Sequence, residues 1–94
     1  MNKQNPENKV YNLRKQLSEA VGSEDWKDIK DICNSLNNAI GDLGIEGKAK
    51  NLLVKYLKDL KDGAKSQDKR KCVTNFYLFN ANLVEYNIVE GLVH

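Results

Sequence analysis

Histidine and cysteine, the residues that most often build catalytic and metal sites, are scarce in this 94-residue chain. It has one histidine, His94 at the last position, and two cysteines, Cys33 and Cys72, without the close spacing of a metal-binding pair. Acid–base catalysis by histidine and histidine-dependent zinc sites are therefore disfavoured. We expect no enzymatic activity, no cofactor, no metal, and free thiols in a reducing compartment.

Long apolar runs are also missing. No stretch approaches the ~18 apolar residues that span a bilayer, and the first ten residues lack the apolar core of a signal peptide. The hydrophobic share of 40% and charged share of 30% are ordinary for a globular protein. We expect one domain over residues 1–94 in the cytoplasm, with a membrane-associated form left open.

The net charge is only +2, but it is unevenly distributed. Residues 1–46 carry six Lys/Arg and eight Asp/Glu, whereas residues 47–71 carry nine Lys/Arg and three Asp/Glu. Such a basic segment can meet nucleic acid, anionic lipid, a nucleotide phosphate or an acidic protein, or can simply be a solvated helix face. The candidate basic patch consists of Lys55, Lys58, Lys65, Lys69, Arg70 and Lys71.

Apolar residues recur every three or four positions along four stretches, which predicts an all-α chain. The predicted helices span residues about 6–21, 24–41, 46–62 and 68–90. Gly22 and Gly63 are expected to end the first and third helices, and Ser23 to cap the second. Short connections favour antiparallel neighbours, so we expect a small antiparallel four-helix bundle. No internal repeat is evident. The core is expected to include Trp26, Leu36, Leu53, Leu57, Phe76, Phe79 and Leu83.

The last third of the chain leaves two structures open. Its apolar positions from Cys72 to Tyr86 alternate by four and three residues, which favours a helix. Several asparagines and β-branched residues have low helix propensity, however, and a β-hairpin turning at Asn80–Asn82 is the rival.

The predicted fourth helix is apolar on more than one side, because Val73, Tyr77, Val84 and Ile88 form a second stripe. Either the other helices wrap it, or it contacts a second copy or another protein. The candidate partner-binding residues are Phe76, Tyr77, Phe79, Leu83, Val84, Tyr86 and Ile88.

Glu24, Asp25, Asp28 and Asp31 gather at the predicted start of the second helix. Paired carboxylates can hold magnesium or support hydrolysis. Acidic residues in a first helical turn are equally explained by the helix dipole, and neighbouring lysines are typical of a solvated face. We favour the second explanation.

Three segments carry a resemblance to a known family: VYNLRKQLSEAV (10–21), DIKDICNSLNNAI (28–40) and KNLLVKYLKDL (50–60). Residues 7–60 resemble the immunity proteins of class II bacteriocins, the pediocin-like and lactococcin-A-like group. The resemblance implies a cytosolic four-helix bundle that protects a bacterial cell by engaging the sugar permease attacked by the bacteriocin. It also implies that the C-terminal part, residues 72–94 here, sets specificity.

Two other functions remain open. One is a phage or mobile-element accessory protein that inhibits or sequesters a host protein or a signalling nucleotide, as an oligomer formed through the C-terminal helix. The other is a nucleic-acid-binding module that uses the basic segment, although sequence-specific readers more often employ arginine, of which this chain has only Arg14 and Arg70.

Overall fold

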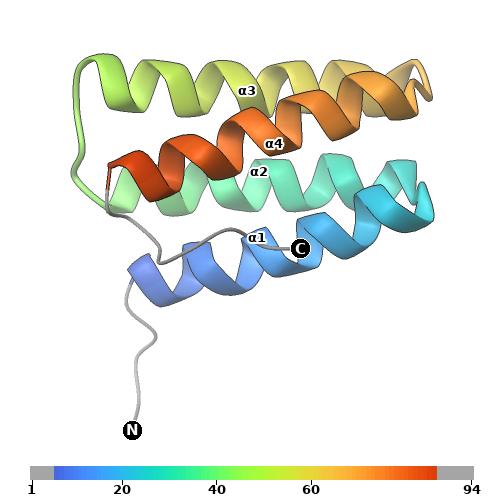
Figure 1. The fold of residues 1–94 in the computed structure, drawn as a ribbon. Coiled ribbons are helices and arrows are strands. Elements are labelled where there is room, and N and C mark those ends of the chain that lie inside the picture. The colour runs from blue at the N-terminus through green and yellow to red at the C-terminus, as the bar shows by residue number, and fades with distance from the viewer. Residues whose placement is uncertain (1–5, 87–94) are drawn as a thin grey trace, which may run out of the picture.

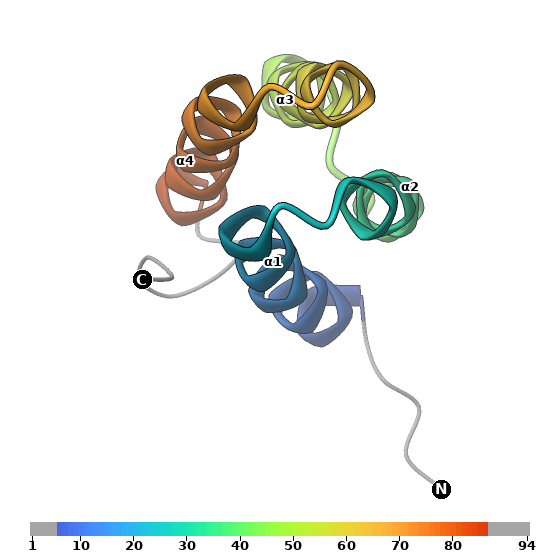
Figure 2. The ribbon, with the colours of Figure 1, turned by 90° about the vertical axis from the view of Figure 1, so that its right-hand side faces the viewer.

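The computed structural model describes residues 6–86 of the chain. Four helices follow one another: α1 (Pro6–Ser23), α2 (Trp26–Asp42), α3 (Lys48–Lys65) and α4 (Lys69–Glu85). Each helix runs in the opposite direction to the one before it (Figure 1), and the end view shows the four arranged in a ring in chain order (Figure 2). The all-α bundle expected from the sequence is thus confirmed. The hairpin alternative is wrong, because Asn80–Asn82 lie within α4. The sequence predicted this helix to residue 90, whereas α4 ends at Glu85 with Tyr86 as its C-cap; residues 87–90 lie outside the described residues.

The α1–α2 and α3–α4 turns lie at the same end of the bundle (Figure 2) and are built alike. In each, one backbone N–H reaches back five residues, from Asp25 to the Ala20 carbonyl at 3.0 Å and from Asp68 to the Gly63 carbonyl at 2.8 Å. The same aspartates cap the next helix: the Asp25 side chain accepts from the Asp28 N–H, and the Asp68 side chain accepts from the Lys71 N–H. Each turn therefore ends one helix and starts the next within two or three residues.

The predicted helix ends at Gly22, Ser23 and Gly63 are wrong, for one shared reason. Both glycines lie within helices, and the left-handed conformation that ends each helix falls instead on Glu24 (φ 57°) and Gln67 (φ 56°). Ser23 does not cap α2, because its hydroxyl donates back to the Glu19 carbonyl at 3.0 Å. The aspartate two residues later is the cap.

The two helical hairpins correspond position by position, 43 residues apart, from Ser23 and Asp25 to Ser66 and Asp68. The buried positions of α1 are Val10, Arg14, Leu17, Ala20 and Val21, and those of α3 are Leu53, Leu57, Leu60, Gly63 and Ala64. Among these five pairs, Leu17 and Leu60 are the one identical pair, so the buried positions correspond by place rather than by residue type. The sequence analysis expected no internal repeat, but the burial pattern and the turn geometry of the two hairpins do repeat.

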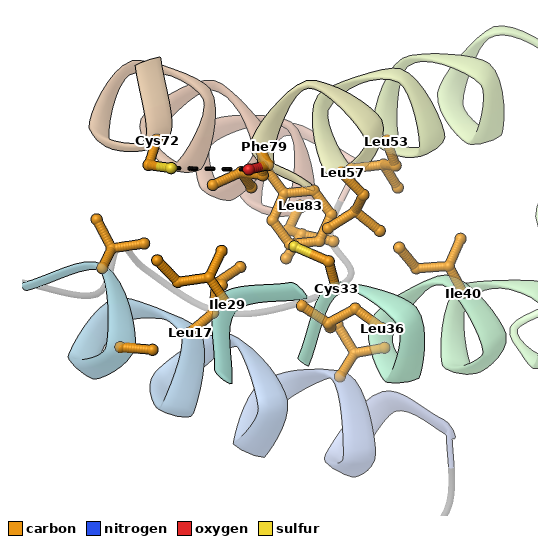
Figure 3. Close-up of a cluster of buried hydrophobic side chains, with 14 of the residues drawn as sticks. Leu17, Ile29, Cys33, Leu36, Ile40, Leu53, Leu57, Cys72, Phe79 and Leu83 are labelled. Carbon is orange, nitrogen blue, oxygen red and sulfur yellow. Dashed lines mark hydrogen bonds between the residues drawn. The ribbon is translucent and has the colours of Figure 1, made fainter. Parts of the chain in front are cut away.

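The core fills the space between the four helices (Figure 3). Five of the seven predicted core residues are wholly or almost wholly buried: Leu36, Leu53, Leu57, Phe79 and Leu83. The other two, Trp26 and Phe76, are partly buried and pack against this core. Burial of each large aliphatic or aromatic side chain contributes about 1.5–3 kcal/mol, which is how so small a chain holds four helices together.

Candidate binding surface

The outward side of α4 exposes apolar side chains that the fold does not cover. Among the described residues, the exposed large hydrophobic side chains are Tyr11, Val73, Tyr77 and Leu78. Three of these four belong to α4, and Tyr77 is the most exposed at 62%. The exposed apolar surface is therefore concentrated on one helix rather than scattered over the molecule.

Comparison with α2 shows that this exposure is not a requirement of the bundle. Residues 72–84 of α4 carry no charge, and residues 32–41 of α2 carry none either. At its exposed positions, however, the uncharged part of α2 has Asn34, Asn37 and Asn38. Asparagine can hydrogen-bond water, whereas the exposed positions of α4 present Val73 and Tyr77. The exposed side chains of an uncharged helix segment can therefore be polar, as in α2, whereas those of α4 include Val73 and Tyr77.

The structure divides the predicted partner-binding residues between core and surface. Phe79 and Leu83 are wholly buried within the chain, so they are unavailable on the surface of the folded protein. Phe76 and Val84 are partly buried against the core, and Tyr86 is partly buried at the end of α4. Tyr77 is fully on the outside, next to Val73 one turn earlier. Ile88 lies outside the described residues. Leu78, which the sequence pattern did not single out, joins the exposed set.

All six residues of the predicted basic patch are exposed, but they do not form one cluster. Lys65, Lys69, Arg70 and Lys71 surround the α3–α4 turn, and we call these four residues the basic turn. Lys55 lies along α3, about 15 Å from Lys65 by the helical rise. The Lys55 ammonium lies 5.8 Å from the centre of the Tyr56 ring, a cation–π contact.

An acidic turn lies beside the basic one, at the same end of the bundle. Glu24, Asp25 and Asp28 are exposed at the α1–α2 turn, and the negative charge of Asp25 raises the pKa of the Asp28 carboxyl. A Glu24 carboxylate oxygen lies 3.6 Å from the Lys69 ammonium nitrogen. Both side chains are about half exposed, so this ion pair contributes well under 1 kcal/mol. This end of the molecule therefore presents opposite charges side by side.

A buried polar pair joins α1 to α4, and the sequence pattern did not reveal it. Arg14 is only 3% exposed, and its guanidinium donates to the Asn80 side-chain oxygen at 3.0 Å. The guanidinium also lies 4.9 Å from the centre of the Tyr11 ring. Burial lowers the pKa of Arg14, although the neighbouring Tyr11 opposes this. The contact between α1 and α4 is the least extensive of the four neighbouring helix contacts, and this pair spans it.

The sequence signal for this pair was present but weak. Arg14 falls on the apolar stripe of α1 between Val10 and Leu17, and Asn80 falls beside Phe79 in α4. A charged residue inside an apolar stripe indicates a buried partner. The partner's identity depends on how α1 and α4 are placed, which the stripe alone does not give.

The two cysteines are free and wholly buried. Burial raises the pKa of the Cys33 thiol to about 12 and also raises that of Cys72. The Cys72 thiol points toward the Leu60 carbonyl oxygen, with 3.6 Å between sulfur and oxygen (Figure 3). Both behave as small core residues rather than as nucleophiles.

Neither a metal cluster nor a membrane-crossing helix is found in the part of the chain that the structure describes. Within residues 6–86, no group of three or more His, Cys, Asp or Glu side chains is placed to hold a metal ion. Over the same residues, every helix is too short or too polar to cross a bilayer. The features that remain as candidates for function are the outer side of α4 and the basic turn at its start. No protein-family model, curated protein or solved structure matches the chain.

Proposed function

We propose that this chain is a non-enzymatic binding protein that docks its partner on the outer side of α4, with the basic turn beside the docking surface. The observation that carries the proposal is the group of exposed, uncharged side chains on α4: Val73, Tyr77 and Leu78. Exposed aromatic and aliphatic side chains that are concentrated in one place are typical of protein-binding surfaces. Tyrosine in particular is enriched among residues that dominate binding energy.

Within this class, we propose the immunity type: a cytoplasmic protein that protects a bacterial cell by engaging a membrane permease and the bacteriocin bound to it. The resemblance of residues 7–60 suggests the family, and α4 lies in the part of the chain to which that family assigns specificity. The basic turn supports a partner at a membrane surface, because each Lys or Arg near an anionic leaflet contributes about 1 kcal/mol of attraction.

A second candidate is an accessory protein that sequesters a host component as an oligomer. Opposite charges lie at the two ends of α4, on Arg70 and Glu85. This placement favours self-association and therefore supports the second candidate. The nucleic-acid alternative is less well supported. Of the two arginines, Arg14 is buried in the bundle, which leaves Arg70 as the one arginine that can reach a base or phosphate.

The test is capture of membrane proteins from low-GC bacterial cells in mild detergent, with the tagged chain as bait and mass spectrometry as readout. We expect a sugar permease to be retained, and protection of sensitive cells when the chain is expressed in them. Tyr77→Asp should abolish both effects, because it places a charge at the centre of the docking surface. Phe79 and Leu83 are unsuitable for this test, because a charge at either position would disrupt the core.

Asn37→Asp is the matched control, since it adds the same charge at an exposed position of α2. Far-UV circular dichroism should show that both variants remain folded. Equal loss of capture in the two variants would remove α4 as the docking surface. Capture of a soluble host protein in place of a permease would shift the function to the second candidate.

A further inference from the structure

A further row of residues, different from the second apolar stripe, runs along α4 on the side opposite its core-facing residues. Core residues Phe79 and Leu83 point inward. Another set, centred on the adjacent residues Tyr77 and Leu78 and extending from them in steps of three and four residues, points outward. We call this set the outer stripe: Arg70, Thr74, Tyr77, Leu78, Ala81 and Glu85. All are exposed except Ala81, which is partly exposed. Residues that share one exposed face along several turns of a helix can pack against the matching face of a second helix.

The outer stripe is self-complementary when it is reversed. Arg70 and Glu85 lie equally far from the midpoint between Tyr77 and Leu78, and so do Thr74 and Ala81. In an antiparallel pair of α4 helices centred on that midpoint, each Arg70 faces a Glu85 of the other copy. The two ion pairs then stand about 22 Å apart along the helix, one at each end. Tyr77 meets Leu78 in the middle.

The residues between the charged ends permit close approach. Thr74 and Ala81 are small, and small residues let helix axes approach to about 8 Å. No charge lies between Lys71 and Glu85, so no ionised group has to be desolvated in the centre. The neighbouring helices α1 and α3 pack on the flanks of α4 and leave its outer side free.

From this arrangement we propose that the protein forms a two-fold symmetric dimer, in which α4 of one copy packs antiparallel against α4 of a second copy through the outer stripe. The occupant of this face is a second copy because its opposite charges are placed to satisfy each other across a two-fold axis. The dimer goes beyond the proposed function and does not depend on it. It covers Tyr77 and Leu78, so the second copy and an external partner compete for the same surface.

The experiment is sedimentation equilibrium of the full chain at low salt, from about 10 μM to about 1 mM, since a single helix pair gives a small interface. We expect a monomer–dimer equilibrium in this range. Arg70→Glu and Glu85→Arg should each raise the Kd by at least about tenfold, because the symmetry turns both attractive pairs into repulsive ones. An equimolar mixture of the two variants should recover dimers. In the mixed dimer the introduced glutamate of one variant faces the introduced arginine of the other, and the unchanged Glu85 faces the unchanged Arg70, so both contacts are attractive.

Lys30→Glu on α2 is the control for Arg70→Glu, because it changes the net charge equally on a helix far from α4. Its Kd should equal that of the unmodified chain. A chain that stays strictly monomeric at about 1 mM would overturn the dimer, and a mixture of the variants that fails to associate would overturn the antiparallel register. A monomer that still captures the permease would refute the dimer alone. Failure of the Glu85→Arg variant, whose docking surface is not covered by a second copy, to capture any membrane protein would refute the proposed function alone.

Discussion

Gly63 lies at a close approach of α3 to α4, and replacing it with alanine tests how tightly the second hairpin is packed. A Cβ atom at this position would stand 3.0 Å from the Cys72 sulfur and 3.3 Å from both the Cys72 backbone nitrogen and the Lys71 Cβ. The backbone nitrogen and the Cβ belong to the first turn of α4 and cannot rotate away. The Cys72 sulfur is wholly buried.

Two opposing effects decide the sign of the change. Alanine in a helix is favoured over glycine by about 1 kcal/mol, since it loses less conformational entropy on folding. Forcing a methyl group into a packed contact costs about 1–3 kcal/mol. We therefore expect Gly63→Ala to lower the free energy of unfolding by about 1 kcal/mol. At Gly41 nothing lies within 4 Å of the added Cβ, so Gly41→Ala should raise it by about 0.5–1 kcal/mol.

Urea denaturation followed by far-UV circular dichroism measures both variants against the unmodified chain. Cys72→Ala combined with Gly63→Ala removes the nearest of the three contacts, and the new methyl group partly fills the space left by the sulfur. The double-mutant cycle should therefore show a favourable coupling energy between the two changes. If Gly63→Ala stabilises the protein as much as Gly41→Ala does, the reasoning from close packing at this hairpin is refuted.

Three further predictions concern the buried polar pair, the thiols and a turn. Asn80→Ala removes the side-chain acceptor of Arg14 and should destabilise the protein by about 2–3 kcal/mol in the same assay, whereas joint replacement of Arg14 and Asn80 by leucine should recover most of that loss. Burial raises the pKa of the Cys33 thiol to about 12, so the thiol of the unfolded chain loses its proton at lower pH than that of the folded chain. The free energy of unfolding should therefore fall between about pH 9 and 12, by up to ~1.4 kcal/mol per pH unit, and Cys33→Ala should make that fall shallower. Gln67→Gly should stabilise the α3–α4 turn by about 0.5–1 kcal/mol, since Gln67 holds a φ of 56°, and a thermal unfolding midpoint that does not rise would contradict this.

Apolar periodicity was sufficient to predict the number of helices, because each helix has a face that the bundle must bury. It located the first seven helix ends only to within about three residues. Gly22 and Gly63 resembled stop signals, since glycine is the usual residue in a left-handed helix end. The structure places Glu24 and Gln67 in that conformation, each followed by a capping aspartate. The aspartate caps, two residues beyond each serine, were the more informative signal.

The buried pair of Arg14 and Asn80 depended on information that a single helix does not contain. Its formation requires α1 and α4 to be neighbours and requires one register between them. Residues 66 positions apart in the chain meet only through the arrangement of all four helices. Sequence patterns predict faces of individual helices, and the pairing of faces follows from how the whole core packs.

The same limit explains why the candidate partner-binding residues of α4 divide between the core and the surface. Two stripes with nearly the same period run along this helix, one through Phe79 and Leu83 and the other through Tyr77. Periodicity shows that both exist but cannot say which of them the bundle buries. Packing decides, and it buries the stripe with the larger apolar volume. Tyr77 then remains outside together with Leu78, at the centre of the outer stripe, whose ends are Arg70 and Glu85. The exposed positions in the uncharged part of α2 are asparagines, whereas those of α4 include Val73 and Tyr77, and this contrast supports the proposed docking role of α4.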